Sequence, residues 1–152
     1  GIKKTTTIAD NVVLCSILRA GLALHTGFMN FFDSAENGFV SAYRHHPNND
    51  TFFDILVEYQ AVPNIENKTL LLIDPMLATG GTLMATIETL KKAGCKTIKG
   101  LFLVAAPEGL KRITEAHPDV EIYVAAVDER LNEVGYILPG LGDAGDKIFG
   151  TK

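Results

Sequence analysis

Short apolar runs alternate with amphipathic stretches along most of this chain. Residues 12–18, 70–73, 97–106 and 120–127 are rich in Val, Ile, Leu and Phe and are bounded by turn residues, as buried strands are. Residues 22–32, 82–93 and 107–116 have the length and composition of helices. Because strands alternate with helices, the pattern predicts an α/β fold: a mostly parallel twisted sheet with helices on both faces.

Two further features extend this prediction. Residues 38–44 and 52–59 read as strands, and the turn-forming residues 45–50 between them predict a long β-hairpin arm. The helix expected at 22–32 is apolar on most of its circumference, and such a helix needs a second surface to cover it. We therefore expect another subunit there, in a homodimer or a higher homo-oligomer.

Composition narrows the class of protein. The 152 residues suit one domain spanning 1–152, and 47% hydrophobic with 21% charged residues is ordinary for a globular protein. A formal charge of −4 without a basic run argues against a nucleic-acid polymer as partner. No apolar stretch reaches the ~20 residues that cross a bilayer, and the first residues lack a signal-peptide segment. We expect no membrane contact and a cytoplasmic location.

The segment from Leu70 to Leu83 carries the clearest chemistry. A buried strand ends at Asp74-Pro75, two glycines follow Thr79, and a helix begins near Thr82. The free N–H groups and positive dipole end of a helix N-terminus bind anions, and glycines let the backbone approach a phosphate closely. Asp74, at the end of the strand, is placed to accept hydrogen bonds from sugar hydroxyls. The segment therefore predicts a site for a ribose 5-phosphate.

The spacing matches neither common nucleotide motif, Gly-x-Gly-x-x-Gly or Gly-x-x-x-x-Gly-Lys-Ser/Thr. It resembles the diphosphoribosyl-binding loop of type I phosphoribosyltransferases, in the variant of the uracil phosphoribosyltransferases. The resemblance implies the type I phosphoribosyltransferase fold and a site for 5-phosphoribosyl 1-diphosphate. The residues that it assigns to this substrate are Asp74, Pro75, Met76, Leu77, Ala78, Thr79, Gly80, Gly81 and Thr82.

Two arginines extend the resemblance. Arg19 follows the first strand in Ile17-Leu18-Arg19-Ala20-Gly21, which is similar to the pyrophosphate loop of the family. Arg44, at the end of a hairpin strand, matches a second arginine that contacts the diphosphate. A guanidinium suits a diphosphate by charge and geometry. The alternatives are a helix-capping loop with a surface arginine at Arg19 and a solvated side chain at Arg44.

The glycine-rich tail, residues 135–146, resembles the uracil-binding segment of the same family. The resemblance implies that backbone groups of Ile137, Gly142, Asp143 and Ala144 bind uracil and that Asp143 also faces the diphosphate substrate. A folded glycine loop can present N–H and C=O groups at fixed spacing, which suits a base with a donor between two acceptors. The catalytic residues expected from the whole resemblance are Arg19, Asp74 and Asp143.

The resemblance implies that uracil and 5-phosphoribosyl 1-diphosphate react to UMP and diphosphate in pyrimidine salvage. It also implies Mg²⁺, held mainly by the diphosphate substrate rather than by protein ligands, and GTP binding. Family members usually carry several tens of further residues at the N-terminus. Two alternatives follow: a non-catalytic, regulatory module that binds phosphoribosyl diphosphate, or an inactive truncated form. A phosphoribosyltransferase for another base is a third, which the tail disfavours.

Overall fold

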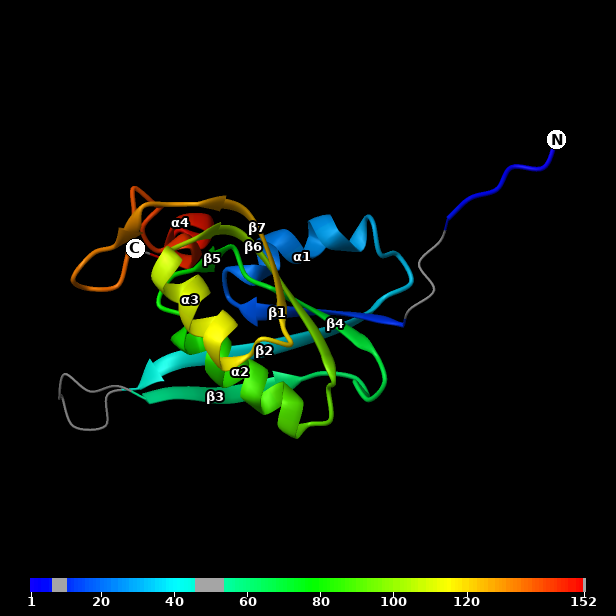
Figure 1. The fold of residues 1–152 in the computed structure, drawn as a ribbon, viewed down its shortest axis with the longest axis horizontal. Coiled ribbons are helices and arrows are strands. Elements are labelled where there is room, and N and C mark those ends of the chain that lie inside the picture. Colours follow the sequence, from blue (N-terminus) through cyan, green and yellow to red (C-terminus); the bar gives the residue numbers. More distant parts are fainter. Residues whose placement is uncertain (7–10, 46–53, 152) are drawn as a thin grey trace.

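The computed structural model describes residues 1–6, 11–45 and 54–151 (Figure 1). Its main sheet has the strand order β3-β2-β1-β4-β6, and β6 also pairs with β5 and β7. All pairs are parallel except β2 with β3. The strands are β1 (Val12–Leu18), β2 (Glu36–His45), β3 (Asp54–Ala61), β4 (Thr69–Ile73), β5 (Met76–Leu77), β6 (Thr97–Ala105) and β7 (Glu121–Val127). The predicted α/β sheet and its hairpin arm, β2 with β3, are confirmed.

Helices cover both faces of the sheet, as the sequence predicts. Figure 1 shows α1 (Gly21–Met29) on one side of the strands and α2 (Gly81–Lys92) with α3 (Pro107–Ala116) on the other. Leu14, on β1, packs in the core beneath α1, whereas its neighbours Val13 and Cys15 belong to the larger core beneath α2 and α3. Because side chains alternate along a strand, β1 supplies both cores and is buried on both faces.

Three details differ from the prediction. Helix α1 ends at Met29 rather than at residue 32, because its last turn tightens: the amides of Asn30 and Phe31 donate to carbonyls three residues back. Strand β5 was not predicted. It forms because the Pro75 carbonyl accepts from two β6 amides and so directs the chain along β6. Residues 130–149, called the tail from here on, form two short strands, β8 (Arg130–Leu131) and β9 (Ile137–Leu138), and α4 (Ala144–Phe149), whereas only a folded glycine loop was expected at 135–146.

None of the helices in the described part of the chain could cross a membrane. Both cysteines, Cys15 and Cys95, are buried free thiols. The carboxyl ends of β1 and β4 lie at the same edge of the sheet, because these strands are parallel and adjacent. The loops that follow them, at Arg19 and Asp74, therefore open onto a common space, where ligands of parallel sheets usually bind.

Candidate active site

The loop between β4 and α2 forms a small hollow at the helix N-terminus. Gly80 is the N-cap of α2 with φ +78°, a left-handed conformation that favours glycine. The N-cap glycine has no side chain to cap the helix, the Thr79 hydroxyl accepts from the Gly81 amide at 3.4 Å, and the first turn holds no acidic residue. The hollow, of about 100 Å³, is lined by Asp74, Met76, Leu77, Ala78, Thr79, Gly80, Thr82, Leu83 and Phe102. A helix N-terminus with further amides facing this opening has the donors and the dipole that bind a phosphate.

Helix α3 supports this loop from behind. A Cβ built on Gly109 would lie 2.1 Å from the Ala78 carbonyl oxygen, so only glycine allows this approach. The Arg112 guanidinium donates to the Thr79 carbonyl at 3.4 Å, which places a positive charge beside the loop. Sequence reasoning missed both residues. A glycine inside a helix is unfavourable and signals a close approach, so Gly109 carried a usable signal.

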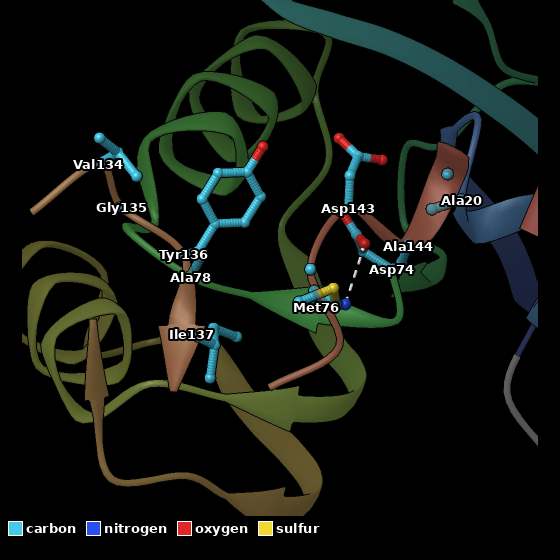
Figure 2. A pocket seen from close by; sticks show the side chains of 12 residues that line it. Ala20, Asp74, Met76, Ala78, Val134, Gly135, Tyr136, Ile137, Asp143 and Ala144 are labelled. Atoms are coloured by element: carbon cyan, nitrogen blue, oxygen red, sulfur yellow. Dashed lines mark hydrogen bonds between the residues drawn. The ribbon is translucent and has the colours of Figure 1, made fainter. Parts of the chain in front are cut away.

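Asp74 stands between this hollow and a second, larger cavity, and lines both. Its carboxylate accepts a hydrogen bond from the Met76 amide at 3.1 Å, which fixes its direction (Figure 2). Burial raises the pKa of Asp74 to about 7, and the bond from Met76 opposes that rise. The carboxyl therefore titrates near neutral pH. It can accept hydrogen bonds from a bound hydroxyl once it is ionised.

The tail is held in place by carboxylate and amide oxygens that accept from its backbone. Glu108, on α3, accepts from the Leu131 amide at 3.0 Å. Asp128 accepts from the Gly140 amide at 2.9 Å, and Asn132 accepts from the amides of Val134 and Tyr136. These bonds fix the short hairpin of β8 and β9 and the turn after it, which contains a cis Leu138-Pro139 bond.

The larger cavity has a volume of about 410 Å³ and lies where this tail meets the ends of β1 and β4. Its lining is Ala20, Asp74, Met76, Ala78, Val134, Gly135, Tyr136, Ile137, Gly142, Asp143, Ala144 and Gly145. In Figure 2, Tyr136 and Ile137 lie on one side, Asp143, Ala144 and Ala20 on the other, and Met76 between them. Residues far apart in the sequence are thus brought to one space.

This cavity includes every residue that the sequence assigned to the base: Ile137, Gly142, Asp143 and Ala144. The Asp143 carboxylate accepts from the Asp146 amide at 2.9 Å and so caps α4, which fixes the direction of that side chain. Sequence reasoning did not single out Tyr136, whose side chain is partly exposed at the cavity. An aromatic residue beside a glycine loop was the available signal, because a ring offers a flat apolar surface to a planar ligand.

Arg19 lies at the neighbouring end of β1. Its guanidinium donates to the Asp146 carboxylate at 3.1 Å and to the Thr151 hydroxyl at 3.0 Å, and half of the side chain is exposed. The peptide bond before it, Leu18-Arg19, is cis. Arg44 belongs to β2, but its side chain lies outside the described residues. Arg19 and the tail thus share one part of the site, and the expected contact of Arg44 stays a prediction.

No group of three or more His, Cys, Asp or Glu side chains that could hold a metal ion occurs in the ranges 1–6, 11–45 and 54–151. Two carboxylates, Asp74 and Asp143, do line the larger cavity. Mg²⁺ in phosphate-transfer sites is commonly held by substrate phosphates with one or two carboxylates, and keeps several waters. The donors present therefore fit a Mg²⁺ ion that arrives with a phosphorylated substrate better than one in a protein cage.

Comparison with known proteins gives a family match over nearly the whole chain. The family model described as "Uracil phosphoribosyltransferase" matches residues 2–151. The solved structure of the AQ2163 protein from Aquifex aeolicus is similar, with a TM-score of 0.85 and 42% sequence identity. That match covers 93% of this chain and 66% of the Aquifex protein, so this chain spans about two-thirds of its length.

Two more distant structures are similar in fold. A purine phosphoribosyltransferase from Pyrococcus horikoshii matches with a TM-score of 0.57 and 19% identity, over 82% of each chain. A hypoxanthine phosphoribosyltransferase from Staphylococcus aureus matches with a TM-score of 0.58 and 18% identity, over 81% of this chain and 65% of that one. At these identities the likeness concerns the fold, which is the type I phosphoribosyltransferase fold expected from the sequence.

Proposed function

Because the chain belongs to the uracil phosphoribosyltransferase family, we propose that it transfers the phosphoribosyl group of 5-phosphoribosyl 1-diphosphate to uracil. The products are UMP and diphosphate, and the reaction serves pyrimidine salvage. One observation supports this most: the phosphate hollow at α2 and the cavity at the tail share Asp74, Met76 and Ala78. A 5-phosphate, its ribose and a base can therefore lie in one continuous site.

Each part of the site has a distinct role in this proposal. The N-terminal turn of α2, from Thr79 to Thr82, holds the 5-phosphate, and ionised Asp74 accepts from the ribose hydroxyls. Main-chain groups of Ile137 and of residues 142–144 bind the base. The side chain of Tyr136, at the same cavity, can cover one face of its ring. Uracil needs one acceptor for N3–H and donors for its carbonyl oxygens, which a fixed backbone supplies.

The chemistry is a substitution at the ribose C1 atom. The bond from C1 to the diphosphate oxygen breaks, a bond from C1 to uracil N1 forms, and the N1 proton passes to the departing diphosphate or to water. Positive charge develops on the ribose and negative charge on the departing diphosphate. Arg19 has five N–H donors and uses two on Asp146 and Thr151, so others remain for the diphosphate. A Mg²⁺ ion that came with the diphosphate would be held by its phosphates with Asp74 or Asp143, and would supply further positive charge. Positioning and charge stabilisation supply the rate.

We also propose that the chain associates with copies of itself. Large apolar side chains are exposed on or just after α1, namely Leu22, Met29 and Phe31, the last 82% exposed. Leu103, Tyr123 and Val127, on β6 and β7, are about half exposed. Exposed large apolar side chains of this kind are typical of interfaces. Light scattering at tens of micromolar should show at least a dimer, and a monomer alone would contradict this.

An assay of diphosphate release tests the proposed function. The protein is incubated with Mg²⁺ and 5-phosphoribosyl 1-diphosphate, together with uracil, cytosine, hypoxanthine or no base. We expect release with uracil and formation of UMP. Release with hypoxanthine instead would assign the chain to another base. Tight binding of the diphosphate substrate in calorimetry without turnover on any base would instead support the regulatory module.

A further inference from the structure

A buried polar chain crosses three elements beside the proposed site. Ser16, on β1, lies with its hydroxyl oxygen 2.6 Å from Nδ1 of His25, on α1. Nε2 of His25 lies 2.8 Å from the amide oxygen of Asn37, on β2. Ser16 is fully buried and His25 is 4% exposed, and the imidazole packs on the Phe39 ring at 4.9 Å between centroids. Polar groups buried to this extent are uncommon and are kept only when paired.

Serine, histidine and asparagine in this order resemble a nucleophilic triad, but the geometry argues against that role. The Ser16 hydroxyl is inaccessible and faces the first turn of α1, where it lies 3.4 Å from the Gly21 carbonyl oxygen. Substrate carbonyls cannot reach it. The three side chains therefore have a structural role: they hold neighbouring elements of the backbone together and do not react with a substrate.

The orientation of the Asn37 amide determines which groups donate and which accept among these three side chains. The Asn37 amide nitrogen donates to the Ala35 carbonyl, so its oxygen faces His25 and needs a donor there. A neutral imidazole protonated at Nε2 supplies that donor and leaves Nδ1 to accept from the Ser16 hydroxyl. Both ring nitrogens and the Ser16 hydroxyl are then paired, with the serine proton on the 2.6 Å bond to Nδ1 rather than on the longer 3.4 Å approach to the Gly21 carbonyl. The three side chains therefore link α1 to both β1 and β2.

This link lies at the base of the loop that carries Arg19. Ser16 precedes Arg19 by three residues, and Gly21 follows it by two. A Cβ on Gly21 would lie 2.7 Å from the Ile73 carbonyl oxygen and 3.1 Å from the Ser16 Cβ, so the start of α1 is pressed against β1 and the end of β4. The tilt of α1 therefore sets where Arg19 and the backbone of Ala20 point. Ala20 lines the larger cavity on the side of Asp143, the residue expected to face the diphosphate, and opposite Tyr136 and Ile137.

We propose that Ser16, His25 and Asn37 form a positioning network that holds the loop of residues 18–21 in its diphosphate-binding geometry. This inference rests on the proposed function. The network touches no reacting atom. Its loss is expected to weaken ligands that carry a diphosphate and to spare those that bind only at α2 and the tail. UMP, which has the 5-phosphate, ribose and base but no diphosphate, is the matched ligand.

The test compares Ser16→Ala, the double variant Ser16→Ala/His25→Leu, and Ile98→Val as a control. Ser16→Ala leaves Nδ1 buried without a partner, whereas the double variant removes both groups, and Asn37 is exposed and can turn to water. The double variant should therefore regain melting temperature lost in Ser16→Ala. Ile98→Val, in the core of β6, costs stability through lost packing alone.

Calorimetry with 5-phosphoribosyl 1-diphosphate and with UMP, both with Mg²⁺, decides the matter. We expect the diphosphate substrate to bind about tenfold more weakly to the double variant, with UMP affinity within about twofold of the unsubstituted chain, because a displaced loop misplaces its donors. Ile98→Val should bind both ligands normally. If the double variant does not fold, Ser16→Ala carries the same comparison.

If all variants bound the diphosphate substrate equally well, the proposed positioning role of the network would be wrong. A parallel loss of affinity for both ligands would also contradict it, because that pattern is the one expected of general structural damage. Failure of the unsubstituted chain to bind either ligand is a different outcome: it would overturn the proposed function, and this inference with it.

Discussion

The loop proposed to bind the phosphate and the tail proposed to bind the base meet at one cavity, yet they are built in different ways. The loop is mainly local: residues 74–82 run from a strand into a helix whose N-terminus supplies the donors, and α3 adds one side-chain bond, from Arg112 to the Thr79 carbonyl. The tail is held from a distance, by Glu108 and Asp128, which accept from its backbone amides. A local site depends on its own backbone conformation. A braced site depends on side chains outside it, so the two should fail in separable ways.

The largest effect is expected from Gly80→Val, which attacks the local site. Gly80 has φ +78°, and a Cβ there would lie 3.3 Å from the Gly109 carbonyl oxygen. The branched side chain strains the turn and crowds the place where a phosphate meets the backbone. Binding of 5-phosphoribosyl 1-diphosphate in calorimetry should fall about a hundredfold or more.

Gly94→Val is the matched control. Gly94 also has a positive φ, +98°, but a Cβ there meets nothing within 4 Å, and it lies just beyond the far end of α2. It should lose stability for the same backbone reason while its substrate affinity stays close to that of the unsubstituted chain. Equal loss of affinity in both variants would show that the phosphate hollow has no special role.

Asp74→Asn sharpens the comparison because Asp74 belongs to both cavities. Hydrogen bonds to a charged acceptor contribute about 1.5–3 kcal/mol, so affinity for the diphosphate substrate should fall about tenfold to a hundredfold at pH 8. Stability should change in the opposite direction. The pKa of Asp74 is raised to about 7 in the folded state, from a value near 4 in the unfolded chain. The stability that the protonated carboxyl contributes is therefore fully present below pH 4 and is lost as the pH rises through 7.

Urea unfolding of both proteins at pH 4 and pH 8 measures this second effect. Asparagine does not titrate and can still accept from the Met76 amide. We expect Asp74→Asn to gain stability over the unsubstituted chain by about 1–3 kcal/mol between these two pH values. If the difference in free energy of unfolding between the two proteins did not depend on pH, burial would not raise the pKa of Asp74.

Asp128→Ala attacks the braced site. The partly buried Gly140 amide would lose its bond to a carboxylate, and hydrogen bonds to charged groups contribute about 1.5–3 kcal/mol. The turn that leads into residues 142–144 should loosen. We expect the KM for uracil to rise about tenfold while the affinity for 5-phosphoribosyl 1-diphosphate stays the same, because the phosphate loop is local.

Asp128→Asn keeps an acceptor oxygen and is the control for charge. It should retain most of the affinity for uracil, as steady-state kinetics would show. Weakening of both substrates by Asp128→Ala would contradict the separation of the two regions.

Asp143→Ala should have the smallest effect on base choice. Its carboxylate caps α4, and removal of a cap costs about 0.5–2 kcal/mol. We expect turnover to fall about threefold to tenfold while the ratio of uracil to cytosine use is preserved, because main-chain groups bind the base. Asp143→Asn retains the cap and should recover stability. A changed base preference in either variant would assign base recognition to this side chain.

The same contrast explains what the sequence could predict. The phosphate loop is contiguous, so its strand, Asp74-Pro75 turn and helix start could be identified from residue order and from the family resemblance. The end of α1 and the strand β5 could not be predicted in this way, because they depend on which carbonyl accepts each backbone amide. The Pro75 carbonyl, for example, accepts from two amides of β6, which is distant in the sequence. Helix boundaries depend on such competing bonds more than on local composition.

The base cavity was predicted only in part. Its four assigned residues came from the tail's resemblance to a known segment, whereas the oxygens that brace the tail lie elsewhere in the sequence. Glu108 is on a helix and Asp128 follows a strand, and neither position carries a local signal of its partner. The network of Ser16, His25 and Asn37 was missed for the same reason: a serine in an apolar strand and a histidine on a helix are unremarkable until the fold pairs them.

The ratio of kcat/KM for uracil to that for cytosine tests the central claim most directly. Cytosine presents an acceptor at N3 and a donor at its exocyclic amine, the reverse of uracil at both positions. If backbone N–H and C=O groups of the tail bind the base, two of them would have no hydrogen-bond partner when cytosine is bound. Each unpaired group costs about 1–3 kcal/mol of binding free energy. We expect a preference for uracil of at least about a hundredfold. An active enzyme that used cytosine as well as uracil would contradict the role given to residues 137 and 142–144.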